Sequence, residues 1–444
     1  MTRRYGYALL SAVVALILGL SAAIYVGVAA DDGSGRESTL ASGNTPRNPA
    51  APVSTGTWVG SWSTSPAAAE PGTETEGMAG RSVRNVVHTG VGGTSARITL
   101  SNLFGQSPLT ITHASLAVAS GSDTAAAVTH SMRRLTFGGD TTVVIPPGGQ
   151  VMSDAVRVGV PADADVLVTT YSPTASGPVT YHPHARQTSY VARGDRTEDA
   201  TGTAYTEEVG VWRYLTALDV LSKDADGTIV VLGDSLTDGI TSTSGANRRW
   251  PDALSRRLRT ALAAGEDLPR YSVVNQGISG NRILTGGLGR PADNPSGLDR
   301  FGRDVLNVTN VKVVVIVLGV NDILRDPQLA DPNRILGGLR TLVGQAHARG
   351  VKVIGATLMP FGGHRGYTDE REGVRQQINS EIRAGKVFDA VADFDEALRD
   401  PYNPRKLRPD YDSGDHLHMS DRGYEQMAEA VDLKSLKGAA PARL

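Results

Sequence analysis

The chain has 444 residues, too many for one ordinary domain, so two or three domains are expected. Its formal net charge of -2 at pH 7 provides no general attraction to nucleic acid or to an anionic membrane. It contains no cysteine, which excludes disulfides, thiolate metal sites, a cysteine nucleophile and a lipoprotein anchor through an N-terminal cysteine.

The N-terminus is typical of an export signal. Two arginines precede an apolar stretch at about residues 7–30, and two aspartates follow it. A basic start, an apolar middle and small residues at the end predict a signal peptide or membrane anchor over residues 1–30. The apolar stretch is long enough to span a bilayer, so cleavage after Ala30 and retention as an anchor both remain open. In either case we expect a secreted or cell-surface protein.

The next two segments differ in composition. Residues 31–57 are rich in Gly, Ser, Pro, Ala and Thr without an apolar period, as in a flexible linker. Over residues 58–221, short alternating runs such as Ala96–Leu100 and Asp165–Tyr171 are separated by Gly, Pro, Asn and Asp clusters. No stretch there has a convincing helical period. The pattern predicts an all-β sandwich domain of the jelly-roll-like kind.

Strands and helices alternate over residues 225–436, which predicts a three-layer α/β domain with a parallel sheet. The run Val311–Leu318 is apolar on both faces after its lysine, as expected of the central strand. The other strands are expected at Thr228–Leu232, Tyr271–Val274, Val351–Thr357 and Val391–Phe394. The helices are expected at Trp250–Leu262, Pro332–Arg349, Thr368–Arg383 and Ser420–Val431, with Asp331 and Ser420 as caps.

Ser235 is the candidate nucleophile. It follows the first strand of the α/β domain by way of Gly233 and Asp234. A buried strand that ends in a tight turn presents its next side chains at the carboxyl end of the sheet, where open α/β sheets keep their sites. We expect Asp234 to hold this turn through hydrogen bonds. Because a serine hydroxyl is a weak nucleophile alone, a base must lie within hydrogen-bond reach.

The candidate base is His418, in a short segment before the last helix. Asp415 lies three residues earlier, so one turn of chain places its carboxylate beside the imidazole ring. There the carboxylate would select the tautomer and stabilise the imidazolium that forms during the reaction. His416 would point elsewhere and receives no catalytic role.

Two loops that follow neighbouring strands are candidates for an oxyanion hole. The absence of a side chain at Gly277 would let its N–H approach a substrate oxygen closely, and Asn321 offers a side-chain N–H. With the N–H of Ser235 these make three donors. Three polar residues beside Gly277 either line the cleft or hold its loops, and both interpretations remain open: Asn275, Asn281 and Arg282.

Four blocks, in this order along the chain, resemble those of the SGNH (GDSL) hydrolase family: Gly233–Leu236, Gly277, Gly319–Asp322 and Asp415–His418. The resemblance implies serine ester hydrolysis on a flavodoxin-like sheet. It implies Ser235 as nucleophile, His418 and Asp415 as base and orienter, and Ser235, Gly277 and Asn321 as oxyanion donors. The β-region that precedes this domain (residues 58–221) is similar to jelly-roll modules found before the same domain in some secreted bacterial carbohydrate esterases.

These features predict an exported serine esterase that hydrolyses short-chain esters. The expected acyl group is acetyl, and the expected substrate is an ester of a small molecule or of a glycan. No cofactor is required. No metal site is expected either: His182 and His184 have ligand-like spacing, but no acidic residue lies near them in the sequence. The alternatives are a short-chain lipid esterase or lipase, an acyltransferase, and a catalytically silent cell-surface carbohydrate-binding protein. The sequence leaves the oligomeric state open.

Overall fold

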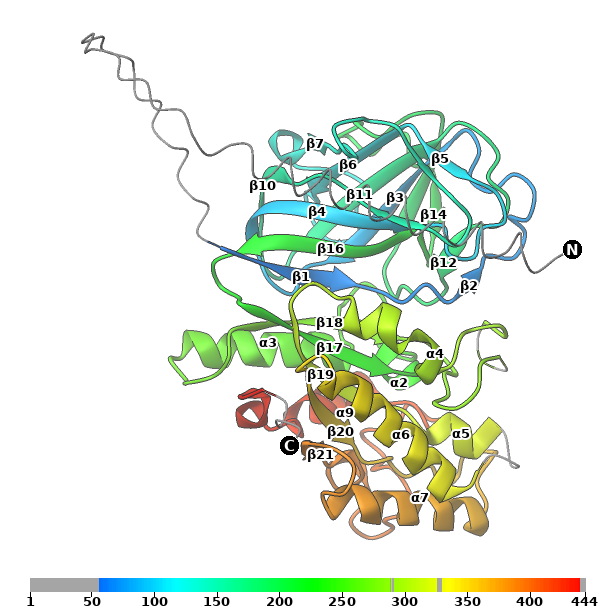
Figure 1. The fold of residues 1–444 in the computed structure, drawn as a ribbon, viewed down its shortest axis with the longest axis vertical. Helices are drawn as coiled ribbons and strands as arrows, with labels where there is room; N and C mark the ends of the chain where they lie inside the picture. Colours follow the sequence, from blue (N-terminus) through cyan, green and yellow to red (C-terminus); the bar gives the residue numbers. More distant parts are fainter. Residues whose placement is uncertain (1–55, 288, 290, 326–329, 440–444) are drawn as a thin grey trace, which may run out of the picture. The chain divides into compact units, whose positions relative to one another are not determined.

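The computed structural model describes residues 56–287, 289, 291–325 and 330–439, and these residues fall within one compact unit (Figure 1). The expected signal or anchor over residues 1–30 lies outside the described residues, as does nearly all of the expected linker. No helix within the described part of the chain has the length and apolar character needed to cross a membrane.

The first half of the described chain is antiparallel β-structure, as the alternating runs predict. One sheet has the strand order β1-β16-β4-β10, with β9 also on β4, and a second has the order β14-β13-β3-β11-β6-β7. The strands of the two sheets are β1 (Thr57–Ser63), β3 (Arg81–His88), β4 (Gly93–Ser101), β6 (His113–Val118), β7 (Arg133–Arg134), β9 (Gln150–Met152), β10 (Val156–Val160), β11 (Asp165–Ser172), β13 (Ser189–Arg193), β14 (Glu207–Val209) and β16 (Leu215–Ser222).

Alternate residues of the two sheets bury a common core, which makes this region a sandwich. Val83 and Val168 come from the second sheet, and Ile98 and Leu218 from the first; all four are at most 1% exposed. Two smaller antiparallel sheets complete the region. Their strands are β2 (Ala68–Ala69), β5 (Leu109–Ile111), β8 (Val143–Ile145), β12 (Thr180–His182) and β15 (Trp212–Arg213), and a single helical turn, η1, spans Thr129–Ser131.

The second half contains a parallel five-stranded sheet with the order β18-β17-β19-β20-β21, which confirms the predicted α/β fold. The strand predicted to be central, β19 (Val311–Val317), is the third of the five. The others are β17 (Gly227–Gly233), β18 (Tyr271–Gly277), β20 (Lys352–Ala356) and β21 (Ala390–Ala392). The register of β17 and β18 pairs Gly233 with Gly277, so these two strands end side by side.

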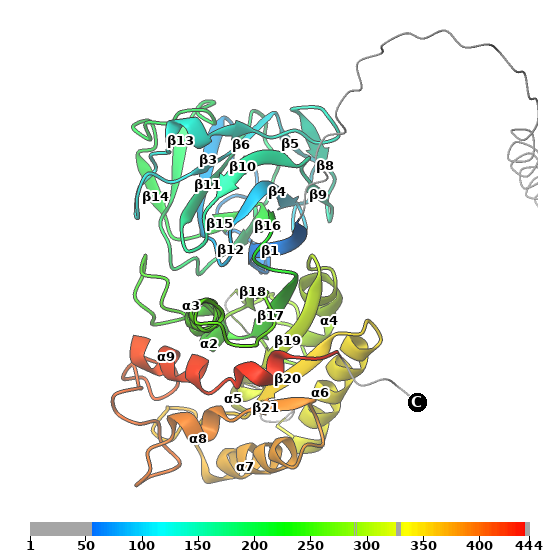
Figure 2. The same ribbon diagram turned by 90° about the vertical axis from the view of Figure 1, so that its left-hand side faces the viewer.

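Helices cover both faces of this sheet (Figure 2). Odd-numbered residues of β17 and β19, such as Ile229 and Val313, pack with α3 (Trp250–Ala263), α8 (Phe394–Leu398) and α9 (Asp421–Glu429). Even-numbered residues, such as Val230 and Val314, pack with α4 (Gly297–Phe301), α6 (Pro332–His347) and α7 (Asp369–Arg383). This alternation follows from the twofold side-chain period of a strand.

The predicted helix caps are present. The Asp331 side chain accepts a hydrogen bond from the second residue of α6, and the Ser420 side chain caps α9. The short helical segments α2 (Ser235–Asp238), α5 (Val320–Arg325), η2 (Gly302–Leu306) and η3 (Leu433–Leu436) were not expected. A segment of four to six residues is too short to show a helical period in the sequence.

Candidate active site

The turn after β17 presents Ser235 at the carboxyl end of the sheet. Ser235 begins the short helix α2, and Asp234 caps that helix by accepting a hydrogen bond from the N–H of Leu236 at 3.0 Å. Gly233 must lack a side chain, because a Cβ there would lie 2.0 Å from the hydroxyl oxygen of Thr237. The tight turn predicted from the sequence therefore depends on close packing between the strand end and the helix.

Ser235, His418 and Asp415 lie in one hydrogen-bonded chain. The Nε2 atom of His418 is 2.8 Å from the Ser235 hydroxyl oxygen. The Nδ1 atom of the same ring is 2.6 Å from a carboxylate oxygen of Asp415. With the proton on Nδ1 donated to the carboxylate, Nε2 is free to accept the serine proton, which is the arrangement of a general base.

The Asp415 carboxylate is held as an anion. Its second oxygen accepts the backbone N–H groups of Leu417 and His418 at 3.0 and 2.8 Å. Partial burial would raise the pKa of Asp415, but these bonds and the His418 ring outweigh it and hold the pKa well below its usual range. His416 instead faces Asp412, with Nδ1 2.6 Å from that carboxylate, and so makes no contact with the serine.

Asn321 and Asp234 join the ends of two neighbouring strands. The Asn321 amide nitrogen donates to the Asp234 carboxylate at 3.1 Å, and the Asn321 oxygen accepts from Arg325 at 2.9 Å. Burial raises the pKa of Asp234 to about 6, against the lowering effect of the Leu236 N–H. The bond to Asp234 uses one of the two hydrogens that an amide nitrogen carries.

The expected role of Gly277 in the oxyanion hole is wrong for this geometry. Its N–H already donates to the side-chain oxygen of Asn275 at 2.8 Å. Gly277 lacks a side chain for a packing reason, because a Cβ there would lie 2.3 Å from the backbone nitrogen of Asp238. The glycine thus allows the end of β18 to lie against α2, the helix that carries Ser235.

Gly280, three residues further on, faces the site instead. Gly280 and Ser279 line the same cavity as Ser235, whereas Gly277 does not. Among the described residues, the N–H groups of Gly280 and Ser235 have no hydrogen-bond acceptor. Gly280 has φ +76°, a conformation that favours glycine. The signal that the sequence offered was the glycine itself.

The polar residues around this loop hold it in place rather than line the cavity. The Asn275 side chain donates to the carbonyl of Thr237 at 2.6 Å. The Asn281 side chain donates to the Pro295 carbonyl at 2.7 Å, and Arg282 donates to the Gly287 carbonyl at 3.0 Å. Of the two interpretations left open by the sequence, the structure favours loop support for all three.

The cavity around the serine has a volume of about 400 Å³. Its walls come from several parts of the chain, including a histidine of the β-region: His184, Ser235, Ile240, Ser279, Gly280, Arg325, His364, Arg365, Asp415, Leu417 and His418. Among the described residues, no group of three or more His, Cys, Asp or Glu side chains is arranged to hold a metal ion.

A buried histidine–aspartate contact links the β-region to α2, the helix that begins at Ser235. His182, at the end of β12, has Nε2 2.9 Å from the carboxylate of Asp238, the last residue of α2. No acidic residue lies near His182 in the sequence, and the structure brings Asp238 to it from a distant segment. The partners are 56 residues apart, so no local pattern could have paired them.

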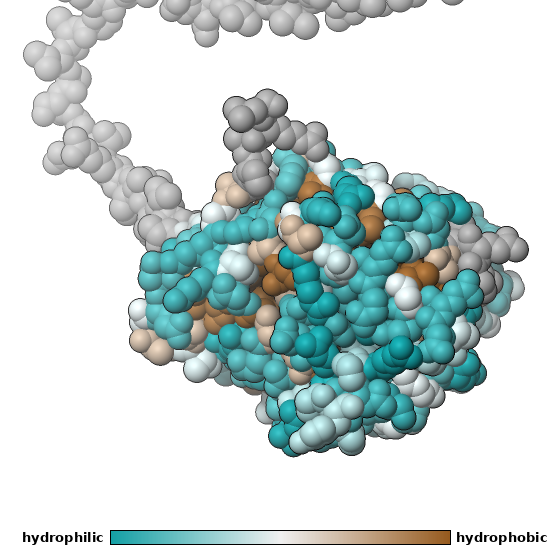
Figure 3. Space-filling view, turned by 90° about the horizontal axis from the view of Figure 1, so that it is seen from below, coloured by the Kyte–Doolittle hydropathy of each residue, from teal (hydrophilic) through white to brown (hydrophobic). Residues whose placement is uncertain are grey.

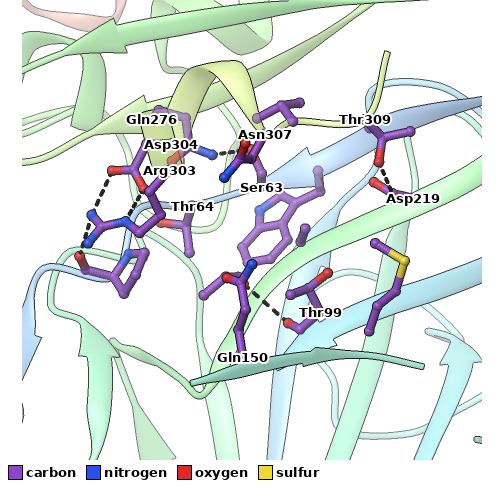
Figure 4. Close-up of a pocket in the computed structure, with 17 residues that line it drawn as sticks. Ser63, Thr64, Thr99, Gln150, Asp219, Gln276, Arg303, Asp304, Asn307 and Thr309 are labelled. Atoms are coloured by element: carbon purple, nitrogen blue, oxygen red, sulfur yellow. Dashed lines mark hydrogen bonds and ion pairs between the residues drawn. The ribbon is translucent and has the colours of Figure 1, made fainter. Parts of the chain in front are cut away.

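A second cavity, of about 210 Å³, lies between the β-region and the α/β region (Figure 4). Its walls include strand residues of the sandwich, such as Thr99 and Asp219, and Asn307 and Thr309 of the α/β region. In this cavity Thr309 donates to Asp219 at 2.6 Å. Ser235, Asp415 and His418 do not line it, so it is separate from the cavity described above.

Residues 231–426 match the GDSL-like Lipase/Acylhydrolase family. No curated protein matches the chain. Among solved structures, the chain is similar to a GDSL-like lipase from Bacteroides thetaiotaomicron VPI-5482, with 19% identity over 46% of this chain and 84% of the other (TM-score 0.32). It is also similar to an acetyl xylan esterase from Geobacillus stearothermophilus, with 21% identity over 50% of this chain and 98% of the other (TM-score 0.36).

Proposed function

We propose, from the premise that residues 231–426 are a domain of the GDSL-like lipase/acylhydrolase family, that this carboxylic ester hydrolase works through Ser235, His418 and Asp415. The observation that carries the proposal is the continuous chain of hydrogen bonds from the serine hydroxyl through both ring nitrogens to the carboxylate. An ordinary serine at a strand end would need neither a histidine nor an aspartate in this arrangement.

The reaction proceeds in two halves. Nε2 of His418 takes the proton of Ser235 as its oxygen attacks the ester carbonyl, and the resulting oxyanion is bound by the N–H groups of Ser235 and Gly280 and by Asn321. The C–O bond to the alcohol breaks, and His418 gives its proton to the departing alcohol. Water then attacks the acyl-serine by the same route, which releases the carboxylic acid and restores the serine.

We propose short acyl chains, acetyl above all, for the acid part of the ester. The large hydrophobic side chains that are exposed, within the described part of the chain, are Val144, Met152 and Tyr402. On the face seen in Figure 3, hydrophilic residues predominate and the hydrophobic ones form separate areas. A lipase that docks on a lipid surface needs a continuous apolar patch, so these observations favour a soluble ester, such as an acetylated glycan, over the lipid alternative.

The test is the release of p-nitrophenol from acetyl, butyryl and palmitoyl esters by the purified protein and by Ser235→Ala. We expect the acetyl ester to be cleaved fastest, and the variant to lose activity on the order of 10⁶-fold, as when a triad nucleophile is removed. A preference for palmitate would contradict the acyl-chain proposal. Full activity in Ser235→Ala would contradict the assignment of the nucleophile.

Export is proposed from the N-terminal sequence alone. Fractionation of cells that express the full chain should place the esterase activity outside the cytoplasm, either in the medium after cleavage or with the membrane as an anchored protein. Activity confined to the cytoplasm would contradict export.

A further inference from the structure

We infer that His182 and Asp238 are positioning residues for the oxyanion loop, so that the β-region forms part of the catalytic apparatus. This inference rests on the proposed esterase function. It starts from the ion pair between His182, in the β-region, and Asp238, three residues after the nucleophile Ser235.

Asp238 connects two elements of the site. One carboxylate oxygen faces His182, and the other accepts both the N–H and the hydroxyl of Ser279, at 3.0 and 2.5 Å. Ser279 immediately precedes Gly280, whose N–H we assign to the oxyanion. The carboxylate therefore fixes the loop that carries this donor relative to the helix that carries the nucleophile.

The hydrogen-bond pattern makes the His182–Asp238 contact a charged one. Nδ1 of His182 is 2.9 Å from the carbonyl oxygen of Ser65, which can only accept, so Nδ1 carries a proton. Nε2 faces the Asp238 oxygen that Ser279 does not bind; the pKa of Asp238 lies below its ordinary value, so this oxygen carries no proton and Nε2 donates as well. With protons on both nitrogens the ring is an imidazolium, held against a carboxylate.

Both partners are removed from water. The His182 and Asp238 side chains are each 3% exposed, and Ser279 is 4% exposed. Burial would raise the pKa of Asp238, but the charge and hydrogen bond of His182, together with Ser279, outweigh it and hold the pKa below its ordinary value. A buried ion pair is costly to form without further hydrogen bonds, and here every polar atom of the pair has one.

The chain provides a matched control for the effect of losing a buried histidine–aspartate pair. His347, at the end of α6, has Nε2 3.0 Å from the Asp389 carboxylate, and their side chains are 15% and 9% exposed. Neither residue lines the cavity around Ser235. Removal of His347 should lower stability without a specific effect on the reaction.

The experiment compares kcat and KM for p-nitrophenyl acetate in the wild-type protein, His182→Leu, His182→Gln and His347→Leu, well below their unfolding temperatures. We expect His182→Leu to lower kcat by about 10-fold or more, with KM changed by less than about 3-fold, because a misplaced oxyanion donor weakens binding of the transition state only. His182→Gln keeps a donor to Asp238 and should recover most of kcat. His347→Leu should leave kcat within about 2-fold of wild type.

Several results would overturn the inference. One is a kcat in His182→Leu within about 2-fold of wild type, and another is an equal loss of kcat in His347→Leu, which would show a general effect on stability. If His182→Leu does not fold, Ser279→Ala removes one bond to Asp238, and an unchanged kcat in that variant rejects the role. A wild-type protein without esterase activity would instead reject the proposed function.

A separate observation concerns the substrate. We propose that the site takes esters that carry an anionic group, such as a carboxylate, on the acid or the alcohol part. Arg325 and Arg365 both line the cavity around Ser235 and are exposed. Among the described residues that line the cavity, the carboxylate is that of Asp415, which is bound to His418 and to two backbone N–H groups.

A further donor lies beside these arginines. The N–H of Gly366 donates to Nδ1 of His364 at 3.1 Å, which places the proton of the neutral ring on Nε2. Burial is the first cause of the lowered His364 pKa; the Asp415 carboxylate acts against it and raises the pKa, and the charges of Arg365 and Arg325 lower it further. A wall rich in donors and positive charge suits a ligand rich in acceptors and negative charge.

The test uses two pairs of esters that differ by one carboxylate: phenyl acetate with 4-carboxyphenyl acetate, and p-nitrophenyl butyrate with the p-nitrophenyl monoester of glutaric acid. For each ester, kcat/KM is divided by the rate constant for its hydrolysis by hydroxide, which removes the difference in intrinsic reactivity. We expect this ratio to be higher for the carboxylated member of at least one pair. Arg365→Gln should reduce that preference about 10-fold, as for the loss of a charge-assisted hydrogen bond. The exposed Arg349, which lies outside the cavity, provides Arg349→Gln as the control for net charge.

A preference in the phenyl acetate pair would place the anionic group on the alcohol part of the ester. A preference in the butyrate and glutarate pair would place it on the acid part. No preference in either pair would overturn the proposal, as would a preference unchanged in both Arg365→Gln and Arg325→Gln. Failure to hydrolyse any of the four esters would reject the proposed function itself.

Discussion

His416 and His418 differ in what their rings reach, although they lie two residues apart in one loop. Each has Nδ1 2.6 Å from an aspartate carboxylate, but only His418 has its other nitrogen on Ser235. We expect His418→Ala to lower kcat by several orders of magnitude, on the order of 10⁴-fold or more, because the base is lost. His416→Ala should stay within about 10-fold of wild type. Similar losses in the two variants would contradict His418 as the base.

The buried Asp238 carboxylate makes stability depend on pH. Its pKa is lower in the folded protein than in the unfolded chain, so its contribution to stability is complete above about pH 4, the ordinary range of an aspartate, and is lost as the pH falls through the folded value. The free energy of unfolding of wild type should therefore exceed that of Asp238→Asn near neutral pH, and the difference should shrink toward pH 3. Urea denaturation of both proteins from pH 7 to pH 3 measures this, and a difference that grows with acid would be contrary to the ion pair.

At the scale of elements, the site depends on the close approach of β18 to α2. A Cβ at Gly277 would lie 2.3 Å from the Asp238 nitrogen and 2.8 Å from the Thr237 carbonyl carbon, both of which are backbone atoms that cannot move independently of α2. We expect Gly277→Ala to lower the free energy of unfolding by about 1–3 kcal/mol and to reduce kcat, because α2 carries Ser235.

Gly337 is the control for the effect of the added methyl group. It is exposed in the interior of α6, and a Cβ there would have no atom within 4 Å. Since alanine is the better helix former, Gly337→Ala should be neutral or stabilise by about 0.5–1 kcal/mol. Chemical denaturation of both variants tests the comparison, and an unaltered stability in Gly277→Ala would contradict the packing argument.

At the scale of the molecule, Arg300 joins the β-region to the sheet of the α/β region. Its guanidinium is fully buried and donates to the Ser65 hydroxyl at 2.8 Å, to the Gly233 carbonyl at 2.8 Å and to the Asn281 side chain at 2.9 Å. It also pairs with Asp304 at 3.1 Å. Burial lowers the pKa of Arg300 to about 10, so the group stays charged at neutral pH.

We expect Arg300→Met to lower the free energy of unfolding by about 3–5 kcal/mol, because the acceptors around it would remain buried without their donor. The same contacts predict that the two regions of the wild-type protein unfold together. Tryptophan fluorescence and far-ultraviolet circular dichroism should then give coincident denaturation curves. Two separate transitions in the wild-type protein would show that the regions are independent.

Some features of this protein follow from the sequence alone, because they depend on neighbours along the chain. The alternation of apolar residues predicts the antiparallel region, and the apolar runs with intervening helical segments predict the parallel sheet with Val311–Val317 at its centre. The contact between Asp415 and His418 is equally local, because three residues separate them.

Other features were decided by tertiary structure, since they join residues that are far apart in the chain. Whether Gly277 or Gly280 faces the cavity depends on how the end of β18 packs against α2. The sequence shows that both positions are glycine, but it does not show which of them packs against another segment of backbone. The pairing of His182 with Asp238, and of Ser65 with Arg300, requires the two regions to pack against each other. The sequence by itself determined the long elements and the candidate nucleophile, whereas packing between distant segments decided which groups support it.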